Sequence, residues 1–302
     1  MHGVNLKPGA AAGSAFEEIV PGVVVYRHNW ADGTCALVFG DTGAAAVDGG
    51  GDPADGHAMA THLRGRGHEP DRLIYTHGHS DHVWGAAALG EGEVIAHELT
   101  PEVMARQVPS WAQRWQVKED EARARVPWPT VTFSDELQVH LGGRTLRLLR
   151  TPGHSIDGIS VLVQDCGVLL AGDCAATGIV PALGDGDGRI LEASLRSLAN
   201  MNIDVLVPGH GPVVRGAEVG DWLRWGADYL LGVRQRVREQ LSAGISVADV
   251  AATVPYEEFV GDRLSRDRHG MPDRHASAVR KIIDEERTRM PQPFADSIRG
   301  GV

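Results

Sequence analysis

The sequence is poor in cysteine and has no long apolar segment. Its three cysteines, Cys35, Cys166 and Cys174, form no C-x-x-C pair and no even set. This argues against a disulfide framework and suits a reducing compartment, so we predict a cytoplasmic protein. No window of about eighteen residues is continuously apolar, and we therefore predict no transmembrane helix and no membrane partner.

Basic residues are also scarce. Lys and Arg number 29 against 40 Asp and Glu, which gives a formal net charge of −11. Nucleic-acid binding draws its affinity from Lys and Arg contacts to phosphates, so this balance argues against a nucleic-acid partner. Residues 1–15 are rich in Gly and Ala but lack a basic segment followed by an apolar core. We interpret them as a flexible lead-in rather than a secretory signal.

What the sequence does have is a dense group of metal-competent side chains. His77, His79, Asp81 and His82 lie within six residues, directly after an apolar run that predicts a buried strand. Imidazole nitrogen and carboxylate oxygen are ligands for a divalent ion such as zinc. Isolated histidines are usually surface residues, but four such side chains in six positions favour a metal loop. In an extended turn, His77 and His79 project to one side, and the next two ligands can face a second point.

Four further motifs follow predicted strands along the chain. They are Ala46–Gly50 with Asp48, Thr151–Ser155 with His154, Leu170–Asp173, and Val207–Pro212 with His210. Because each candidate ligand follows a strand, ligands distant in sequence can converge on one edge of a sandwich.

Taken in order, these motifs resemble those of the metallo-β-lactamase-fold metallohydrolases, in the branch of glyoxalase II, lactonases and thioesterases. The resemblance covers about residues 20–215. It implies a four-layer αββα sandwich, with two divalent ions held near one sheet edge. Matched motif by motif, it assigns His77, His79 and His154 to one ion, Asp81, His82 and His210 to the other, Asp173 as the bridge, and Asp48 as a residue that positions a ligand.

The same resemblance implies a hydrolase. Two divalent ions, Zn²⁺ first with Fe or Mn as alternatives, would lower the pKa of a water between them from 15.7 towards about 7. Asp81 would orient this nucleophile and pass a proton to the leaving group, so neither Ser80 nor Cys174 is required. The family's true β-lactamases usually have cysteine or serine in place of Asp173, which favours cleavage of an ester-type bond.

The expected substrate is a small molecule or an acyl thioester, with thioester or lactone first and phosphodiester or β-lactam as alternatives. A mononuclear-iron persulfide dioxygenase is a second class that the same ligands could serve. No basic cluster of the kind that would hold glutathione is evident in the sequence. A homodimer is left open.

We divide the chain into the lead-in, a catalytic domain over residues 16–215 and a helical C-terminal region over residues 216–302. Residues 97–130 are charged, with interleaved tryptophans, and are predicted to be a helical insertion. Its apolar face either packs on the domain or forms a lid over the active site. The candidates to line a substrate pocket are Trp84, Trp111, Trp115 and Trp128.

Some local predictions rest on weaker sequence patterns. We predict one helix over Val83–Leu89 and only helices after Pro212, including segments at about 246–262 and 273–290. Two polar clusters, Arg268–His269 and Arg274–His275, are interpreted as solvated or interhelical contacts in preference to substrate anchors.

Overall fold

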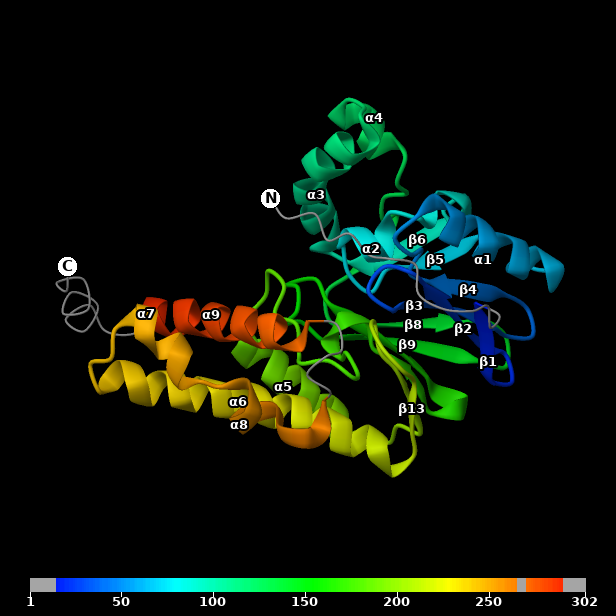
Figure 1. Ribbon diagram of the computed structural model, residues 1–302. Coiled ribbons are helices and arrows are strands. Elements are labelled where there is room, and N and C mark those ends of the chain that lie inside the picture. Colours follow the sequence, from blue (N-terminus) through cyan, green and yellow to red (C-terminus); the bar gives the residue numbers. More distant parts are fainter. Residues whose placement is uncertain (1–14, 265–269, 290–302) are drawn as a thin grey trace.

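The strands of the protein form two mixed sheets that pack face to face. In a computed structural model that describes residues 15–264 and 270–289, one sheet has seven strands in the order β1 to β7, and the other has six in the order β13-β12-β11-β10-β9-β8 (Figure 1). The first sheet comprises β1 (Phe16–Val20), β2 (Val23–His28), β3 (Gly33–Phe39), β4 (Ala44–Val47), β5 (Arg72–Ile74), β6 (Glu93–His97) and β7 (Val131–Phe133). The second comprises β8 (Glu136–His140), β9 (Thr145–Arg150), β10 (Ile159–Val163), β11 (Val168–Leu170), β12 (Val205–Val207) and β13 (Val214–Arg215).

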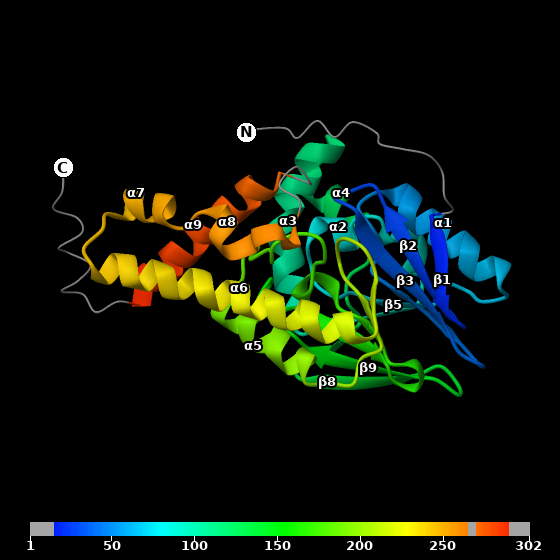
Figure 2. The same ribbon diagram turned by 60° about the horizontal axis from the view of Figure 1, so that its bottom comes forward.

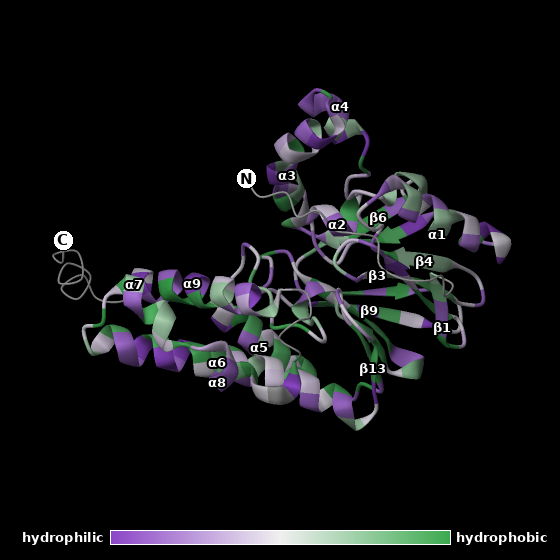
Figure 3. Cartoon of the chain, viewed as in Figure 1, coloured by the Kyte–Doolittle hydropathy of each residue, from purple (hydrophilic) through white to green (hydrophobic). Residues whose placement is uncertain are grey.

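The space between the sheets is filled by aliphatic side chains that alternate along each strand. In β2, Val23 and Val25 face the second sheet, whereas Val24 and Tyr26 face the opposite way. This period of two is the geometry of a pleated strand, and it gives the first sheet two apolar faces. Figure 3 shows hydrophobic residues, in green, along many of the strands of both sheets.

Helices cover both outer faces. The α-helices are α1 (Pro53–Gly65), α2 (Ser80–Val83), α3 (Thr100–Trp115), α4 (Glu119–Ala124), α5 (Gly188–Ala199), α6 (Ala217–Ser242), α7 (Val247–Val250), α8 (Tyr256–Val260) and α9 (Met271–Arg289). Short 3₁₀ turns occupy Ala86–Leu89, Gln164–Cys166, Gly172–Cys174, Ala251–Thr253 and Gly261–Arg263. Helices α1 and α3 pack on the first sheet, α5 and α6 pack on the second, and α9 packs on α6 (Figures 1 and 2). The predicted four-layer αββα sandwich is confirmed.

Two local predictions were wrong. The helix expected over Val83–Leu89 is not continuous: α2 ends at Val83 and a 3₁₀ turn begins at Ala86, because the Gly85 amide donates to the Gly50 carbonyl at 2.9 Å instead of to a carbonyl of the helix. A β-carbon on Gly85 would lie 2.2 Å from the Gly49 carbonyl oxygen, so only glycine fits here. After Pro212 the chain first adds the short strand β13 and only then becomes helical. The helical segment predicted over about 246–262 is confirmed as α7, a 3₁₀ turn, α8 and a second 3₁₀ turn, with a break at Pro255, which cannot continue a helix from the preceding turn.

Several predictions lie wholly or partly outside the described residues. They concern the lead-in apart from residue 15, the cluster Arg268–His269, and residues 290–302 of the C-terminal region. Within the described part of the chain, no helix is long and apolar enough to cross a membrane.

The C-terminal helices are tied to the sandwich by a buried carboxylate. Glu286 on α9 accepts hydrogen bonds from Arg189 on α5, at 2.7 and 2.9 Å, and from Arg238 on α6 at 2.5 Å. Its side chain is only 3% exposed. Burial alone would raise the pKa of Glu286, but the guanidinium groups of Arg189 and Arg238 lower it below its ordinary value.

We therefore expect Glu286→Gln to reduce the free energy of unfolding at pH 7 by about 1.5–3 kcal/mol, the range for hydrogen bonds to charged groups. Because the pKa of Glu286 is lower in the folded state, its charge stabilises the fold above the unfolded pKa, and this contribution is lost as the pH falls through the folded value. Urea unfolding of both proteins at several pH values tests this. A difference between wild type and variant that does not shrink at acid pH would contradict it.

Candidate metal centre

The predicted ligands lie in loops that follow strands of both sheets, with His154 in the loop after β9. The metal loop His77–His82 follows β5, Asp173 follows β11, and His210 follows β12. Two backbone hydrogen bonds join the sheets at this edge, one from the amide of Thr34 to the Gly209 carbonyl and one from the amide of Ile159 to the Thr76 carbonyl, each 2.8 Å long. Residues far apart in sequence thus share one end of the sandwich.

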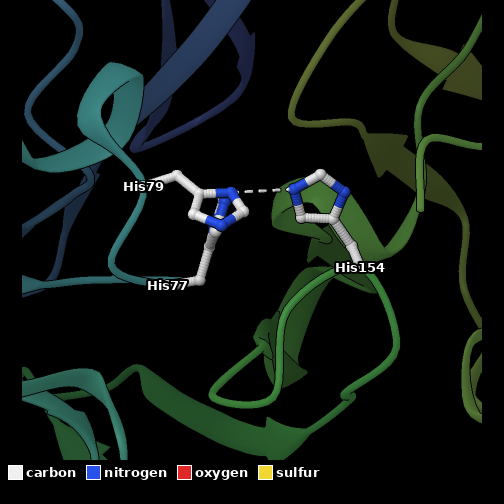
Figure 4. Close-up of side chains that lie close together, drawn as sticks. All are labelled: His77, His79 and His154. Atoms are coloured by element: carbon white, nitrogen blue, oxygen red, sulfur yellow. Dashed lines mark hydrogen bonds between the residues drawn. The ribbon is translucent and has the colours of Figure 1, made fainter. Parts of the chain in front are cut away.

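One group of three histidines forms the first candidate ion site. His77, His79 and His154 each present a ring nitrogen within 4.8 Å of the other two. Figure 4 shows His79 and His154 facing each other, with Nδ1 of His79 and Nε2 of His154 3.0 Å apart. Three imidazole nitrogens at this spacing could hold one divalent ion.

A second group lies beside the first. Asp81, His82 and His210 also bring one ligand atom each within 4.8 Å of one another. The Nε2 atom of His210 is 3.3 Å from Oδ2 of Asp81. The three side chains mix nitrogen and oxygen donors, which suits a second divalent ion.

Asp173 faces both groups. Its Oδ2 atom lies 3.3 Å from Nε2 of His154 and 3.3 Å from Nε2 of His210, and its Oδ1 atom lies 3.3 Å from Nε2 of His82. The backbone of Gly209 approaches so closely that a β-carbon there would be 1.9 Å from Oδ1 of Asp173. Glycine at this position lets the His210 loop pass over the carboxylate.

The site fits divalent ions in one further respect. Nε2 of His77, Nε2 of His82 and Oδ1 of Asp173 are buried and have no hydrogen-bond partner among the described residues. Leaving a buried polar atom unsatisfied costs about 1–3 kcal/mol. These three side chains bring one ligand atom each within 4.8 Å of one another. A bound ion would satisfy them.

The second ring nitrogen of every one of these histidines is hydrogen-bonded. Such contacts fix ring orientation and leave the other nitrogen for a metal. The pairs are His77 Nδ1 with Thr76 Oγ1 at 3.1 Å, His79 Nε2 with Asp185 at 3.1 Å, His82 Nδ1 with Asp48 at 2.8 Å, His154 Nδ1 with the Ala182 carbonyl at 3.0 Å, and His210 Nδ1 with the Ala31 carbonyl at 3.1 Å.

Asp48 lies beneath the metal loop rather than in it. Its carboxylate accepts hydrogen bonds from the amide and the hydroxyl of Thr76, both at 2.7 Å, and contacts His82. Its backbone has a φ of 61°, a left-handed conformation that aspartate tolerates better than most residues. Asp48 thus orients His82 and anchors the start of the loop.

Burial and charge act in opposite directions on this cluster. Burial lowers the pKa of His77 far below its ordinary value, so this imidazole is unprotonated. At His82 the effect of burial is outweighed by Asp173, Asp48 and Asp81, which raise the pKa well above its ordinary value. At His210 it is outweighed by Asp173 and Asp81, which raise the pKa to about 10. Despite burial, the facing histidines hold the pKa values of both carboxyl groups low. The carboxylates of Asp81 and Asp173 therefore favour positive charge beside them.

Two positioning residues were missed by the sequence analysis. Asp157 is fully buried, accepts a hydrogen bond from the amide of Gly78 at 2.8 Å and another from the hydroxyl of Ser155, and so joins the metal loop to the His154 loop. Asp185 accepts from His79 and also lies 4.0 Å from Arg106 of α3. A carboxylate three residues after His154, and the acidic loop before α5, were the available signals.

Replacing Asp185 by asparagine should weaken metal binding about 10–100-fold, the usual cost of losing a partner of a metal-binding histidine. The carboxylate of Asp185 makes a charge-assisted hydrogen bond to His79, and an amide would weaken it. Competition with a chelating dye measures the effect. As a matched control, Arg106→Gln removes the other contact of Asp185 and should leave the affinity unchanged. Equal affinities for wild type and Asp185→Asn would refute the role.

The four candidate pocket tryptophans, Trp84 and three in the insertion, are placed unequally. Trp84 and Trp111 are buried, with exposed fractions of 3% and 1%. The indole N–H of Trp111 donates to the hydroxyl of Ser80 at 2.8 Å, and Trp115 meets Trp84 edge-on at 4.8 Å. Trp128 donates to the Arg123 carbonyl within the insertion itself. For Trp84 and Trp111 the structure favours the packing interpretation, and pocket or lid roles stay predictions.

The fold and these motifs define the class of protein. Residues 28–210 match the model of the metallo-beta-lactamase superfamily, which covers more than half of the chain. The chain belongs to this superfamily, and the resemblance stated from the motifs is confirmed. Its fold implies divalent metal ions, which the His and Asp groups described above could bind.

The individual proteins that resemble this chain have low sequence identity to it. The chain is similar to a Beta-lactamase-like protein 2 homolog of Caenorhabditis elegans, with 29% identity over 148 residues, which are 47% of this chain and 42% of that protein. It is 28% identical over 207 residues to the hydroxyacylglutathione hydrolase GloC of Haemophilus influenzae, covering 64% of this chain and 90% of the relative. A solved structure of a metallo-beta-lactamase family protein from Thermus thermophilus matches with a TM-score of 0.62 at 21% identity, covering 89% and 95% of the two chains. The chain thus spans less than half the length of the Caenorhabditis relative.

Proposed function

We propose that this protein is a dinuclear-metal-dependent hydrolase that cleaves an ester-type bond, a thioester or a lactone, in a small molecule or acyl carrier substrate. The observation that carries the proposal is the position of Asp173, whose Oδ2 atom is equidistant, at 3.3 Å, from a histidine of each group. One carboxylate facing two ligand sets is the arrangement of a two-metal site. The mixed nitrogen and oxygen donors favour zinc, with iron or manganese as alternatives.

Bound divalent ions would supply a nucleophile from water at neutral pH and would polarise the scissile carbonyl. The residues of the chain would orient the water and transfer protons. Asp81 is the more exposed of the two carboxylates in the cluster, at 19% against 8% for Asp173, so it can reach a substrate. It is placed to orient the attacking water and to pass a proton to the departing sulfur or oxygen. Water adds to the acyl carbon, the carbon–sulfur or carbon–oxygen bond breaks, and an acid and a thiol or alcohol leave.

The bond type rests on two supports. An aspartate occupies the bridging position, which the resemblance associates with thioesterases and lactonases. A relative that aligns over most of its own length is named a hydroxyacylglutathione hydrolase. Hydroxyacylglutathione is a thioester.

The proposal is tested by a hydrolysis screen of the purified protein with thioesters, lactones, phosphodiesters and β-lactams. We expect turnover of a thioester or lactone, its loss with a chelator and its return with Zn²⁺. Turnover that persists after complete removal of metal would overturn the proposal. Oxygen uptake with a persulfide substrate and one bound iron would instead identify a sulfur dioxygenase.

A cysteine nucleophile is the competing explanation for thioester cleavage, and Cys174 adjoins Asp173. Its side chain is buried, and burial raises the pKa of the thiol to about 12, so the reactive thiolate is not populated at neutral pH. We expect Cys174→Ser to keep the turnover number and the metal content of the wild type. Loss of turnover with both ions still bound would show that the thiol takes part.

A further inference from the structure

The turn between β2 and β3 has an unusual backbone. The amide of Gly33 donates to the carbonyl of Trp30 at 3.0 Å, which closes a four-residue turn around Ala31 and Asp32. Both central residues have positive φ values, 53° and 55°, which is the sign pattern of a type I′ hairpin turn. Aspartate tolerates this left-handed region, but alanine is disfavoured there. Residues held in such a conformation by their surroundings cluster at functional sites.

The contacts of the turn are with the loop that carries the candidate ligand His210. The carbonyl of Ala31 accepts a hydrogen bond from Nδ1 of His210 at 3.1 Å, and the carbonyl of Asp32 accepts one from the amide of Gly211 at 3.1 Å. Gly33 and His210 also face each other as an isolated antiparallel bridge. A change in the sign of φ at residue 31 would reorient the turn and remove its carbonyl from the imidazole.

Thr34 binds the same loop from the start of β3. Its amide donates to the Gly209 carbonyl at 2.8 Å, and its hydroxyl donates to the Pro208 carbonyl. The residue is only 4% exposed. Each of the residues 208 to 211 is therefore bonded to the segment 31–34, although the two segments are about 175 positions apart in the sequence.

The other candidate ligands are oriented by other parts of the chain. In the first group, the ring partners of His77, His79 and His154 come from positions 76, 185 and 182. In the second group, His82 is oriented by Asp48, which follows β4. The β2–β3 turn thus fixes a ligand of the second group, and a distortion of the turn would act on the two ion sites unequally.

We propose that the segment Ala31–Thr34 sets the affinity of the second group for its ion, because it fixes the position and ring orientation of His210. Ala31 and Thr34 are positioning residues, since both act through the His210 loop. This inference rests on the proposed dinuclear function. It adds the element of the chain that controls the step from one bound ion to two.

Substitutions at residue 31 test the role of the backbone conformation. Valine is β-branched and is an outlier at positive φ, so Ala31→Val should change the turn. We expect its affinity for the second ion to fall at least about tenfold, as when a metal-binding histidine loses its partner. Glycine adopts positive φ without a steric penalty, so Ala31→Gly is the matched control and should bind both ions as wild type does. Competition with a chelating dye gives the two stepwise Zn²⁺ affinities.

A second pair of variants tests the side chain of Thr34. Thr34→Val keeps the shape of the residue but removes the hydroxyl that donates to the Pro208 carbonyl. We expect the affinity for the second ion to fall severalfold while that for the first ion is unchanged. Thr34→Ser restores the hydroxyl and should restore the affinity. Circular dichroism of all four variants checks that the fold is intact.

Cadmium NMR identifies which ion is affected, because each bound ion gives its own resonance. The resonance that weakens in Ala31→Val should be the one that is lost in His210→Ala, and not the one that is lost in His154→Ala. Two ions bound as tightly in Ala31→Val and Thr34→Val as in wild type overturn the inference, while the hydrolase function stands. Equal weakening of both ions also overturns it, because the turn would then support the whole site. A wild-type protein that retains only one ion contradicts the two-metal function itself, and this inference with it.

Discussion

Asp173→Asn should abolish the two-ion state and lower kcat/KM more than about 100-fold, which is beyond the usual cost of disturbing a ligand's partner. The carboxylate lies 3.3 Å from His154, His82 and His210, and thus belongs to both groups of ligands. An amide keeps the volume of the side chain but removes its charge. Metal analysis by mass spectrometry should give about one ion per chain or fewer, and circular dichroism should show an intact fold.

Asp120→Asn provides the control for this experiment. Asp120 lies in α4 and is exposed, far along the chain from any candidate ligand. Its replacement changes the net charge by the same amount and should leave metal content and turnover as in wild type. If Asp173→Asn still binds two ions and turns over substrate, the bridging role of Asp173 is wrong.

Asp48→Ala should destabilise the fold by about 3–5 kcal/mol, the cost of removing one partner from a buried charged contact. Asp48 is 2% exposed, and its loss would leave the Thr76 amide and Nδ1 of His82 without partners and would remove the acceptor of the Thr76 hydroxyl proton. Alanine at a φ of 61° adds backbone strain. Urea unfolding in the presence of a chelator measures this effect without the contribution of bound metal.

The variant Asp48→Asn separates the two causes. Asparagine tolerates the left-handed backbone and can still accept one hydrogen bond, so we expect a loss about half as large as in Asp48→Ala. An unfolding free energy for Asp48→Ala within about 1 kcal/mol of wild type would show that the contacts of Asp48 are not needed by the fold.

The sandwich and the clustering of the ligands were predictable because their signals are local. Each ligand directly follows a short apolar run, and strands that end at one edge bring such residues together. The positions of Asp157 and Asp185 were not predictable in this way, because Asp157 meets Gly78, 79 residues earlier, and Asp185 meets His79, 106 residues earlier. Contacts of that range follow from packing and leave no periodic pattern.

The contacts of the C-terminal helices were likewise only partly predictable from the sequence. The cluster Arg274–His275 was interpreted as solvated or interhelical, and His275 is indeed buried between the Tyr229 hydroxyl and the Val254 carbonyl, at 2.9 Å from each. Its neighbour Arg274 lines the cleft between helix α9 and the loop Val180–Gly184. Adjacent residues on a helix point in different directions. Only the packing of α9 on α6 and on the loop Val180–Gly184 decides which of the two side chains becomes buried.

The central claim is that the chain holds two divalent ions, and counting them is the most direct test. The purified wild-type protein, loaded with Zn²⁺ and freed of excess by gel filtration, should contain about two ions per chain, as two-metal sites do. Turnover should rise in proportion to occupancy by the second ion when metal is returned to the metal-free protein. A stable content of one iron per chain, or no retained metal at all, would contradict the account.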